Sequence, residues 1–301
     1  MISLAIPTRN SERFIGALIK QIDDLAGEIE ETIEVIIVDD ASNDSTLKNI
    51  YETLKFVNSR NLIFSLFQNF SRLGQQKNSL LSLVKTNGEK IFLVEDDIQF
   101  DRSILYFFLN ATDSSTKIDL VIGTQKKSGK GEISSWVFWK IIKALTRGQI
   151  PEREMLLRMF TRESLNSLIE NGQANWTVTE NCNRLFVRKK YIQLESVKYL
   201  KGTTRHSLVN RLTLSIEIFL RFLRLGLVGI TLLVALMSAS FVALIYFLTS
   251  SPDTVSYWPL TVFSSLAFCI SGFIFVLSTY QILVDSVEPI KSLPSPKRHI
   301  Y

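Results

Sequence analysis

Two long stretches without a charged residue, near the C-terminal end, constrain this chain most. Leu225–Pro252 is the first of them and Thr254–Val284 is the second. Each can supply the roughly 20 predominantly apolar residues that an α-helix needs to cross the hydrocarbon core of a bilayer. Since only Asp253 separates them, we predict two transmembrane helices, at about 225–249 and 256–284, joined by a tight turn.

Basic residues flank this pair of segments on its outer sides. Three arginines lie between positions 211 and 224, and three basic residues lie between positions 291 and 298. Positively charged flanks stay on the cytoplasmic side of a membrane. We therefore predict a multi-pass protein of the cell (inner or plasma) membrane, with both termini cytoplasmic.

The remaining residues divide into a cytosolic domain at 1–206, an amphipathic helix along the membrane surface at 207–224, and a cytosolic tail at 285–301. The start, MISLAIPTRN, lacks the basic and apolar regions of a signal peptide. Two cysteines are too few for a disulfide framework. The net charge of +5 comes without a dense basic run or interleaved aromatic residues, so we predict no nucleic-acid partner.

Short β-rich runs alternate with amphipathic helical patterns over the first 125 residues. The runs are ISLAIP, EVIIVDD, LIFSLFQ, KIFLVEDD and DLVIGTQ. This alternation is typical of an α/β domain with a largely parallel sheet. Helices are expected within 11–29, 45–58 and 74–88, the last closed by Gly88. Beyond them, the pattern predicts a helix that starts near Arg162 and a further strand within 184–199, and it leaves 128–161 undecided.

Three of these runs end in proline or polar residues, at the place where ligands bind in open α/β sheets. They are Pro7, Arg9 and Asn10 at the end of the first run, Asp39 and Asp40 at the end of the second, and Glu95, Asp96 and Asp97 at the end of the fourth. Carboxylates gathered at one edge repel one another unless a cation or several donors neutralise them. A hard divalent cation such as Mg²⁺ or Mn²⁺ would do so through oxygen ligands.

The segments SLAIPTRN, VIIVDDASNDST and FLVEDDIQF resemble three landmarks of the family 2 inverting glycosyltransferases. LFQNFSRLGQQKNSLLSLV, LLRMFTRESLNSL and VLSTYQILVDSVEPIKSLP resemble further segments, so the resemblance covers nearly the whole chain. Together with the two predicted spans, it points to the polyprenyl-phosphate glycosyltransferases, the group of dolichol-phosphate mannose synthase. It implies a GT-A (Rossmann-like), mostly parallel sheet flanked by helices.

The resemblance also implies roles for individual residues. The nucleotide would be bound by Pro7, Arg9, Asn10, Asp39, Asp40 and Asp96, and Mg²⁺ or Mn²⁺ by Glu95, Asp97 and Gln99. The catalytic residues would be Asp97, Arg158 and Arg205, with Thr204 beside the last, because guanidinium groups suit phosphate contacts. The implied partners are a UDP- or GDP-sugar donor, a polyprenyl-phosphate acceptor and the lipid bilayer, and a homo-oligomer is left open.

The chain departs from the family's pattern at four positions, which are Ser11, Gln68, Glu95 and Leu156. At Leu156 the family has an acid. A hydroxyl acceptor must lose its proton as it attacks, so it needs a carboxylate base. A lipid phosphate is already an anion and needs none, provided that basic residues position it. The departures therefore favour a phosphate acceptor.

We therefore expect a membrane-anchored, metal-dependent inverting glycosyltransferase that moves a sugar from a nucleotide donor to polyprenyl (undecaprenyl or dolichyl) phosphate at the cytoplasmic face. Two alternatives stay open. One is transfer to a hydroxyl of a lipid-linked sugar, with Glu152 or Glu154 as the base. The other is a non-catalytic membrane scaffold that kept the fold. The identity of the sugar, nucleotide and polyprenol does not follow from the sequence.

Overall fold

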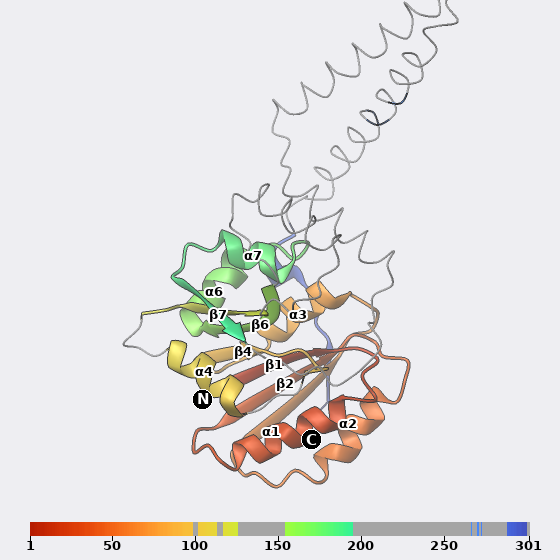
Figure 1. Cartoon of the computed structure of the whole chain (residues 1–301). Helices are drawn as coiled ribbons and strands as arrows, with labels where there is room; N and C mark the ends of the chain where they lie inside the picture. Colours follow the sequence, from red (N-terminus) through yellow and green to blue (C-terminus); the bar gives the residue numbers. More distant parts are fainter. Residues whose placement is uncertain are drawn as a thin grey trace, which may run out of the picture. The chain divides into compact units, whose positions relative to one another are not determined.

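The computed structural model describes residues 1–98, 102–112, 117–125, 154–194, 266, 270, 272 and 288–299 (Figure 1). The chain divides into two compact units, Met1–Arg205 with Val287–Tyr301, and His206–Ser286. The predicted amphipathic helix and both predicted spans lie outside the described residues, apart from positions 266, 270 and 272. Within the described ranges, no helix combines the length and the apolar character needed to cross a bilayer.

A mixed eight-stranded sheet forms the centre of the first unit, in the order β7-β5-β6-β4-β1-β2-β3-β8. The strands are β1 Ile2–Thr8, β2 Ile33–Asp39, β3 Leu62–Gln68, β4 Lys90–Leu93, β5 Leu120–Gln125, β6 Glu154–Thr161, β7 Lys189–Leu194 and β8 Lys297–His299. β1 runs parallel to β2 and β4, β2 to β3, and β5 to β7, whereas β6 and β8 are antiparallel to their neighbours. The predicted α/β class with a mostly parallel sheet is confirmed.

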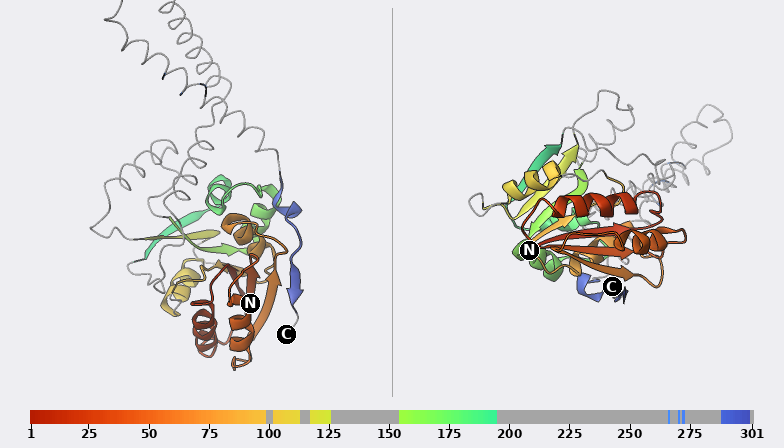
Figure 2. Two further views of the ribbon diagram at one scale, coloured as in Figure 1. Left: turned by 90° about the vertical axis from the view of Figure 1, so that its right-hand side faces the viewer. Right: turned by 90° about the horizontal axis from the view of Figure 1, so that it is seen from below.

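Helices cover both faces of this sheet (Figure 2). They are α1 Ile15–Ala26, α2 Thr46–Leu54, α3 Gln75–Val84, α4 Arg102–Ala111, α6 Arg162–Asn171 and α7 Val178–Arg184, with a 3₁₀ turn, η2, at Ile290–Ser292. The core beneath α1, α2 and α4 takes Ile2, Leu4 and Ile6 of β1, and the core beneath α3, α6 and α7 takes Ala5. Alternate residues of a strand point to opposite faces, so a strand covered on both faces is a continuous apolar run.

One predicted helix boundary is wrong. α3 ends at Val84 with Lys85 as its C-cap, not at Gly88. Gly88 instead lies just before β4, where its N–H donates to Ser3 Oγ at 2.7 Å. A Cβ atom at this position would come within 2.6 Å of Ser3 Oγ. The glycine is therefore required by close packing rather than by a helix end.

The undecided segment before Arg162 contains a strand, β6, that lies between β4 and β5 in the sheet. Met155, Leu157 and Met159 enter one core and Phe160 enters the other, so both faces of β6 are buried. The charged Arg158 in its middle breaks the apolar run that such a strand would otherwise show. The helix expected near Arg162 is confirmed as α6. Of the strand expected within 184–199, residues 189–194 are confirmed, and Arg184 instead ends α7.

The tail at the C-terminal end folds back onto the first unit. Its strand β8 pairs with β3 and forms the edge of the sheet, with His299 opposite Leu66. The carbonyl oxygen of Glu288 accepts a hydrogen bond from the Ala174 N–H at 2.7 Å. The Glu288 carboxylate pairs with Lys77 at 3.0 Å. The tail is therefore part of the same compact unit as the N-terminal residues.

We predict that Ile290→Ala lowers the free energy of unfolding of the first unit by about 2–5 kcal/mol. Ile290 is 1% exposed and belongs to the core beneath α3, α6 and α7, so its truncation leaves a cavity there. Denaturant unfolding of the purified protein measures the change. Lys291→Ala, at the exposed neighbouring position, is the control, with an expected change within about 0.5 kcal/mol. Equal free energies of unfolding of the two variants would show that the tail does not stabilise the first unit.

Candidate active site

The three polar strand ends singled out in the sequence meet at one edge of the sheet. β1 lies between β2 and β4, with Thr8 opposite Asp39 and Ala5 opposite Leu93. The Asp40 N–H donates to the Thr8 carbonyl oxygen at 2.9 Å, and the Val94 N–H donates to the Ala5 carbonyl oxygen at 2.9 Å. The residues after these strands are thus held side by side.

Pro7 occupies an unusual place for proline, inside a central strand. In a parallel strand the N–H and C=O of one residue point to the same side. Residues 5 and 7 therefore face β4, since the Ala5 carbonyl oxygen accepts from Val94. β4 ends at Leu93, opposite Ala5, so the ladder does not require an N–H at Pro7. The proline marks the point where the sheet opens at this edge.

Asp96 ties the end of β4 to the end of β1. Its carboxylate is 6% exposed and accepts hydrogen bonds from Thr8 Oγ1, at 2.8 Å, and from Ser11 Oγ. A buried carboxylate needs such donors because it has lost its water. Ser11 stands where the family pattern has an acid, and an ionised acid could not donate to Asp96. The serine at position 11 therefore supplies a hydrogen bond that the buried Asp96 needs, which an acid there could not supply.

Asp40 holds the loop that leads into α3. Its carboxylate is 1% exposed. Oδ1 accepts from the Leu73 N–H at 2.6 Å and from Asn69 Nδ2 at 3.1 Å, and Oδ2 accepts from the Gly74 N–H at 2.9 Å. Gly74 has a φ of +91°, a conformation that side chains disfavour. The three hydrogen bonds make Asp40 the anchor of residues 69–74.

Asp39 is fully buried, and Ser42 donates to it from both its backbone N–H, at 3.0 Å, and its hydroxyl. Burial raises the pKa of the Asp39 carboxyl, and the neighbouring charges of Asp40 and Asp44 raise it further. The two hydrogen bonds from Ser42 oppose the rise without cancelling it. The carboxyl therefore sits in a tight turn that disfavours its ionised form.

The loops after β1 and β2 are joined to each other through Arg9 and Asn10. Arg9 Nη1 donates to the Asp40 carbonyl oxygen at 2.6 Å. The Asn10 N–H donates to Ser42 Oγ at 2.8 Å, and Asn10 Oδ1 accepts from the Asn43 N–H at 3.0 Å. Asn10 has a φ of +48°, which asparagine tolerates better than most residues. These contacts hold the two predicted nucleotide-binding loops together.

Glu95 and Asp97 flank the buried Asp96 and are both half-buried. Two carboxylates suit Mg²⁺ or Mn²⁺, which typically take one or two from the protein and complete their shell with water and substrate phosphate. In the part of the chain that the structure describes, no group of three or more His, Cys, Asp or Glu is placed to hold a metal. Gln99, the third predicted ligand, lies outside the described residues. The two carboxylates fit an ion whose other ligands are water and diphosphate.

Arg158 is fully buried on β6, opposite Leu93 of β4. Its Nη2 donates to the Thr179 hydroxyl of α7 at 2.6 Å. Arg158, predicted to contact phosphate, therefore lies beside the strand that leads into Glu95 and Asp97. Its side chain is in the interior of the protein. Thr204 and Arg205 lie outside the described residues.

Sequence reasoning did not single out the residues that support these carboxylates. They are Thr8, Asn69, Leu73, Gly74 and Asn78, the last of which accepts from Asn69 Nδ2 at 3.0 Å. Two of them, Leu73 and Gly74, donate through backbone N–H groups, which almost every residue type has. Their role therefore cannot be predicted from residue type. Only Gly74 could have been noticed in the sequence, because a glycine directly before a helical pattern indicates a turn.

We predict that Asp40→Asn speeds amide hydrogen exchange at Leu73 and Gly74 by at least about tenfold. The amide of asparagine presents a donor to one of the two N–H groups, and the loss of a buried hydrogen bond costs about 1–3 kcal/mol. Hydrogen exchange followed by mass spectrometry measures the rate. Asp44→Asn, which alters the cap of α2 at Thr46, is the matched control and should leave residues 69–74 unchanged. Unchanged exchange in Asp40→Asn would contradict the anchoring role.

We also predict a pH dependence of stability that originates at Asp39. Because its pKa is higher in the folded protein than the ordinary 3.8, the folded state binds more protons between these two values. The free energy of unfolding then falls as the pH rises through this interval and levels off above the folded pKa. Asp39→Asn cannot lose a proton, so its stability relative to the unmodified protein should rise from pH 3.8 upward and then level off. Unfolding measured at a series of pH values tests this, and a pH-independent difference would refute it.

Comparison with known proteins assigns this arrangement to a family. Residues 3–179 match the family described as Glycosyl transferase family 2. The chain is 23% identical over 163 residues to the dodecaprenyl-phosphate galacturonate synthase of Rhizobium johnstonii, covering 53% of this chain and 47% of that protein. It is 18% identical over 221 residues to the undecaprenyl-phosphate 4-deoxy-4-formamido-L-arabinose transferase of Proteus mirabilis, covering 72% and 66%. The chain spans about half the length of several curated relatives that it matches.

Solved structures share the fold. The glucosyl-3-phosphoglycerate synthase of Mycobacterium tuberculosis, in complex with Mn²⁺, UDP-glucose and phosphoglyceric acid, superposes with a TM-score of 0.55 at 18% identity, covering 73% of this chain and 77% of that one. The same enzyme has been solved with Mg²⁺ and UDP. The expected GT-A-like sheet is confirmed by this likeness. Because the family match extends over residues 3–179, more than half of the 301 residues, the chain belongs to glycosyl transferase family 2.

Proposed function

We propose that this protein is a membrane-anchored, metal-dependent inverting glycosyltransferase that moves a sugar from a UDP- or GDP-sugar to a polyprenyl phosphate at the cytoplasmic face. The observation that carries the proposal is the meeting of three strand ends at one edge. Asp39 ends β2 there and Asp40 follows it, and Glu95 and Asp97 follow β4. In related α/β folds this edge is where nucleotides bind.

The residues at this edge would have two different roles in binding the nucleotide-sugar donor. Pro7, Arg9 and Asn10 would line the nucleotide site directly, and the fully buried Asp39 would support it from the turn that Ser42 closes. Asp40 and Asp96 would act by positioning, because their carboxylates already accept hydrogen bonds from the loop before α3 and from the end of β1. This assignment refines the role that the family resemblance implied for Asp40 and Asp96.

Glu95, Asp97 and Gln99 would hold the cation, and Arg158 and Arg205 would serve the phosphates. A bound Mg²⁺ or Mn²⁺ supplies positive charge next to the diphosphate that departs. An acceptor phosphate is an anion near neutral pH, so the chain need only orient it toward the anomeric carbon. This mechanism agrees with the family departure at Leu156, since it requires no base there.

The names of two relatives support a lipid-phosphate acceptor. One is a dodecaprenyl-phosphate galacturonate synthase and the other an undecaprenyl-phosphate sugar transferase. At 23% and 18% identity, this support extends to the class of acceptor and not to the sugar.

The C-terminal tail supports the proposed membrane topology. Met1–Arg205 and Val287–Tyr301 belong to one compact unit, so both ends of the intervening segment lie on the same side of any membrane. If that segment enters the bilayer, it would cross it an even number of times, as two spans at about 225–249 and 256–284 would do. With basic flanks on the cytoplasmic side, the unit would then lie in the cytoplasm.

We predict that Asp97→Ala lowers sugar transfer at least about a hundredfold, because a metal contributes several kcal/mol of charge stabilisation to the reaction. The assay incubates membranes with a panel of radiolabelled nucleotide sugars and polyprenyl phosphate, then measures label in the lipid fraction. Asp24→Ala, at an exposed position of α1, is the matched control. Full transfer by Asp97→Ala would refute the metal site. If the unmodified protein neither transfers sugar nor binds a nucleotide diphosphate together with a metal ion, it would be a non-catalytic scaffold.

The acceptor class is tested by replacing both Glu152 and Glu154 with glutamine. If the acceptor is a phosphate, the double variant should retain transfer within a few-fold, because no base is needed. The same radiolabel assay measures it, by counting all label that enters the lipid fraction of the membranes. Abolished transfer would instead favour a hydroxyl acceptor that depends on one of these carboxylates.

A further inference from the structure

Exposed aromatic and basic side chains gather at α7 and the strand that follows it. Phe186 is fully exposed and Tyr191 is 40% exposed. The Arg184 guanidinium stacks on the Trp176 ring at 3.5 Å from its centroid. The segment RLFVRKKY, at 184–191, contains four basic residues and no acidic one. Aromatic rings beside basic groups are typical of surfaces that lie at a membrane interface.

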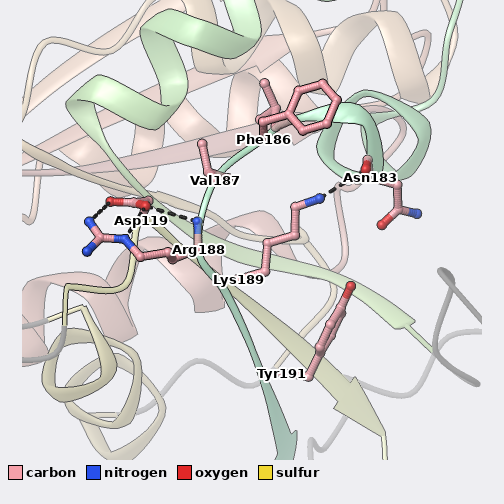
Figure 3. A pocket seen from close by; sticks show the side chains of 8 residues that line it. Asp119, Asn183, Phe186, Val187, Arg188, Lys189 and Tyr191 are labelled. Atoms are coloured by element: carbon pink, nitrogen blue, oxygen red, sulfur yellow. Dashed lines mark hydrogen bonds and ion pairs between the residues drawn. The ribbon is translucent and has the colours of Figure 1, made fainter.

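A hollow of about 610 Å³ lies within this surface (Figure 3). Phe186, Lys189 and Tyr191 line it together with Asn183. Asp119 neutralises the Arg188 side chain at 3.0 Å, and Lys189 Nζ donates to the Asn183 carbonyl oxygen at 3.0 Å. Among the described residues, the buried Nδ2 of Asn183 has no hydrogen-bond partner. An anionic headgroup would match the donors and the positive charge of this hollow.

The start of the C-terminal tail connects the part of the unit that carries this surface to the proposed membrane segment. Glu288 is hydrogen-bonded to Ala174, two residues before Trp176. Only residues 285–287 separate Glu288 from the predicted end of the second span at Val284, a distance of at most about 14 Å. The tail begins at the same end of the unit as α7, away from α1 and α2 (Figure 1).

We propose that the surface formed by Trp176, Arg184, Phe186, Lys189 and Tyr191, the α7 face, rests on the anionic surface of the bilayer, with Phe186 inserted among the headgroups. The proposal goes beyond the proposed function by assigning membrane contact to the first unit itself. It rests on the proposed function only in that residues 206–286 must span the bilayer.

The α7 face would also set the depth of the active site. α7 carries Thr179, which accepts the hydrogen bond from Arg158, and the Val178 N–H donates to Gln76 of α3 at 3.1 Å. Because α7 binds Arg158 and also leads into the exposed residues of the α7 face, it would hold the site near the headgroups. A polyprenyl phosphate presents its phosphate at that level.

The test uses the full chain in nanodiscs of phosphatidylcholine with or without phosphatidylglycerol. In a background with Cys182→Ala and Cys269→Ala, an environment-sensitive fluorophore is attached to Phe186→Cys, and quenchers are carried by the lipids. Phe56→Cys is the matched control, since Phe56 is also an exposed phenylalanine, 71% exposed, but follows α2 at the opposite end of the unit. A third probe at Met237→Cys reports the predicted first span.

The proposal predicts a blue shift and strong quenching at position 186 in discs with phosphatidylglycerol. It predicts neither at position 56. High salt, or Arg184→Glu with Lys189→Glu, should reduce the quenching at 186. Because these positions are exposed or partly exposed, the variants should not unfold the unit.

The probes separate the ways in which the proposal can fail. Quenching at 237 without quenching at 186 would overturn the α7 face and leave the proposed function intact. No quenching at 237 would overturn the proposed spans, and the α7 face with them. A blue shift at 186 that persists in detergent and rises with protein concentration would overturn the lipid contact, because a second copy of the chain would then cover the face.

Discussion

The active-site edge depends on carboxylates that have been taken out of water and satisfied by donors from neighbouring loops. Asp40 accepts hydrogen bonds from the backbone N–H groups of Leu73 and Gly74, and Asp96 accepts hydrogen bonds from the hydroxyls of Thr8 and Ser11. A buried carboxylate without such donors would be strongly destabilising. The same contacts that satisfy these charges therefore determine where the loops after β1, β3 and β4 lie.

This constraint divides the acidic residues into two kinds. Asp40 and Asp96 are almost fully buried and belong to the framework, whereas Glu95 and Asp97 are half-buried on either side of Asp96. The framework carboxylates hold the edge rigid, and a rigid edge orients ligands at low entropic cost. The departure from the family pattern at Ser11 belongs to this framework, because its hydroxyl serves Asp96.

The C-terminal tail links the proposed membrane segment to the same framework. Ile290 and Leu293 are buried in the core that also contains residues of α3 and α6, and β8 extends the sheet at β3. The loop anchored by Asp40 also meets the tail, because Leu73, Pro294 and Pro296 line one small hollow. Under the proposed function, the tail that follows the membrane segment would thus be in contact with the loop that borders the donor site.

The sequence by itself determined the α/β class, the strands β1 to β5, and the placement of acidic residues at three strand ends, because these follow from local periodicity and from chain order. Only the tertiary structure decided the rest. β6 was hidden because Arg158 interrupts its apolar run, and β8 because a short charged edge strand such as Lys297–His299 shows no apolar pattern. Likewise, residue type could not distinguish the buried Asp40 from the half-buried Asp97, whereas the alternation of a strand already set Asp96 apart from Glu95 and Asp97. Which carboxylate is buried depends on donors from loops distant in sequence, and those donors are in part backbone N–H groups that every sequence contains.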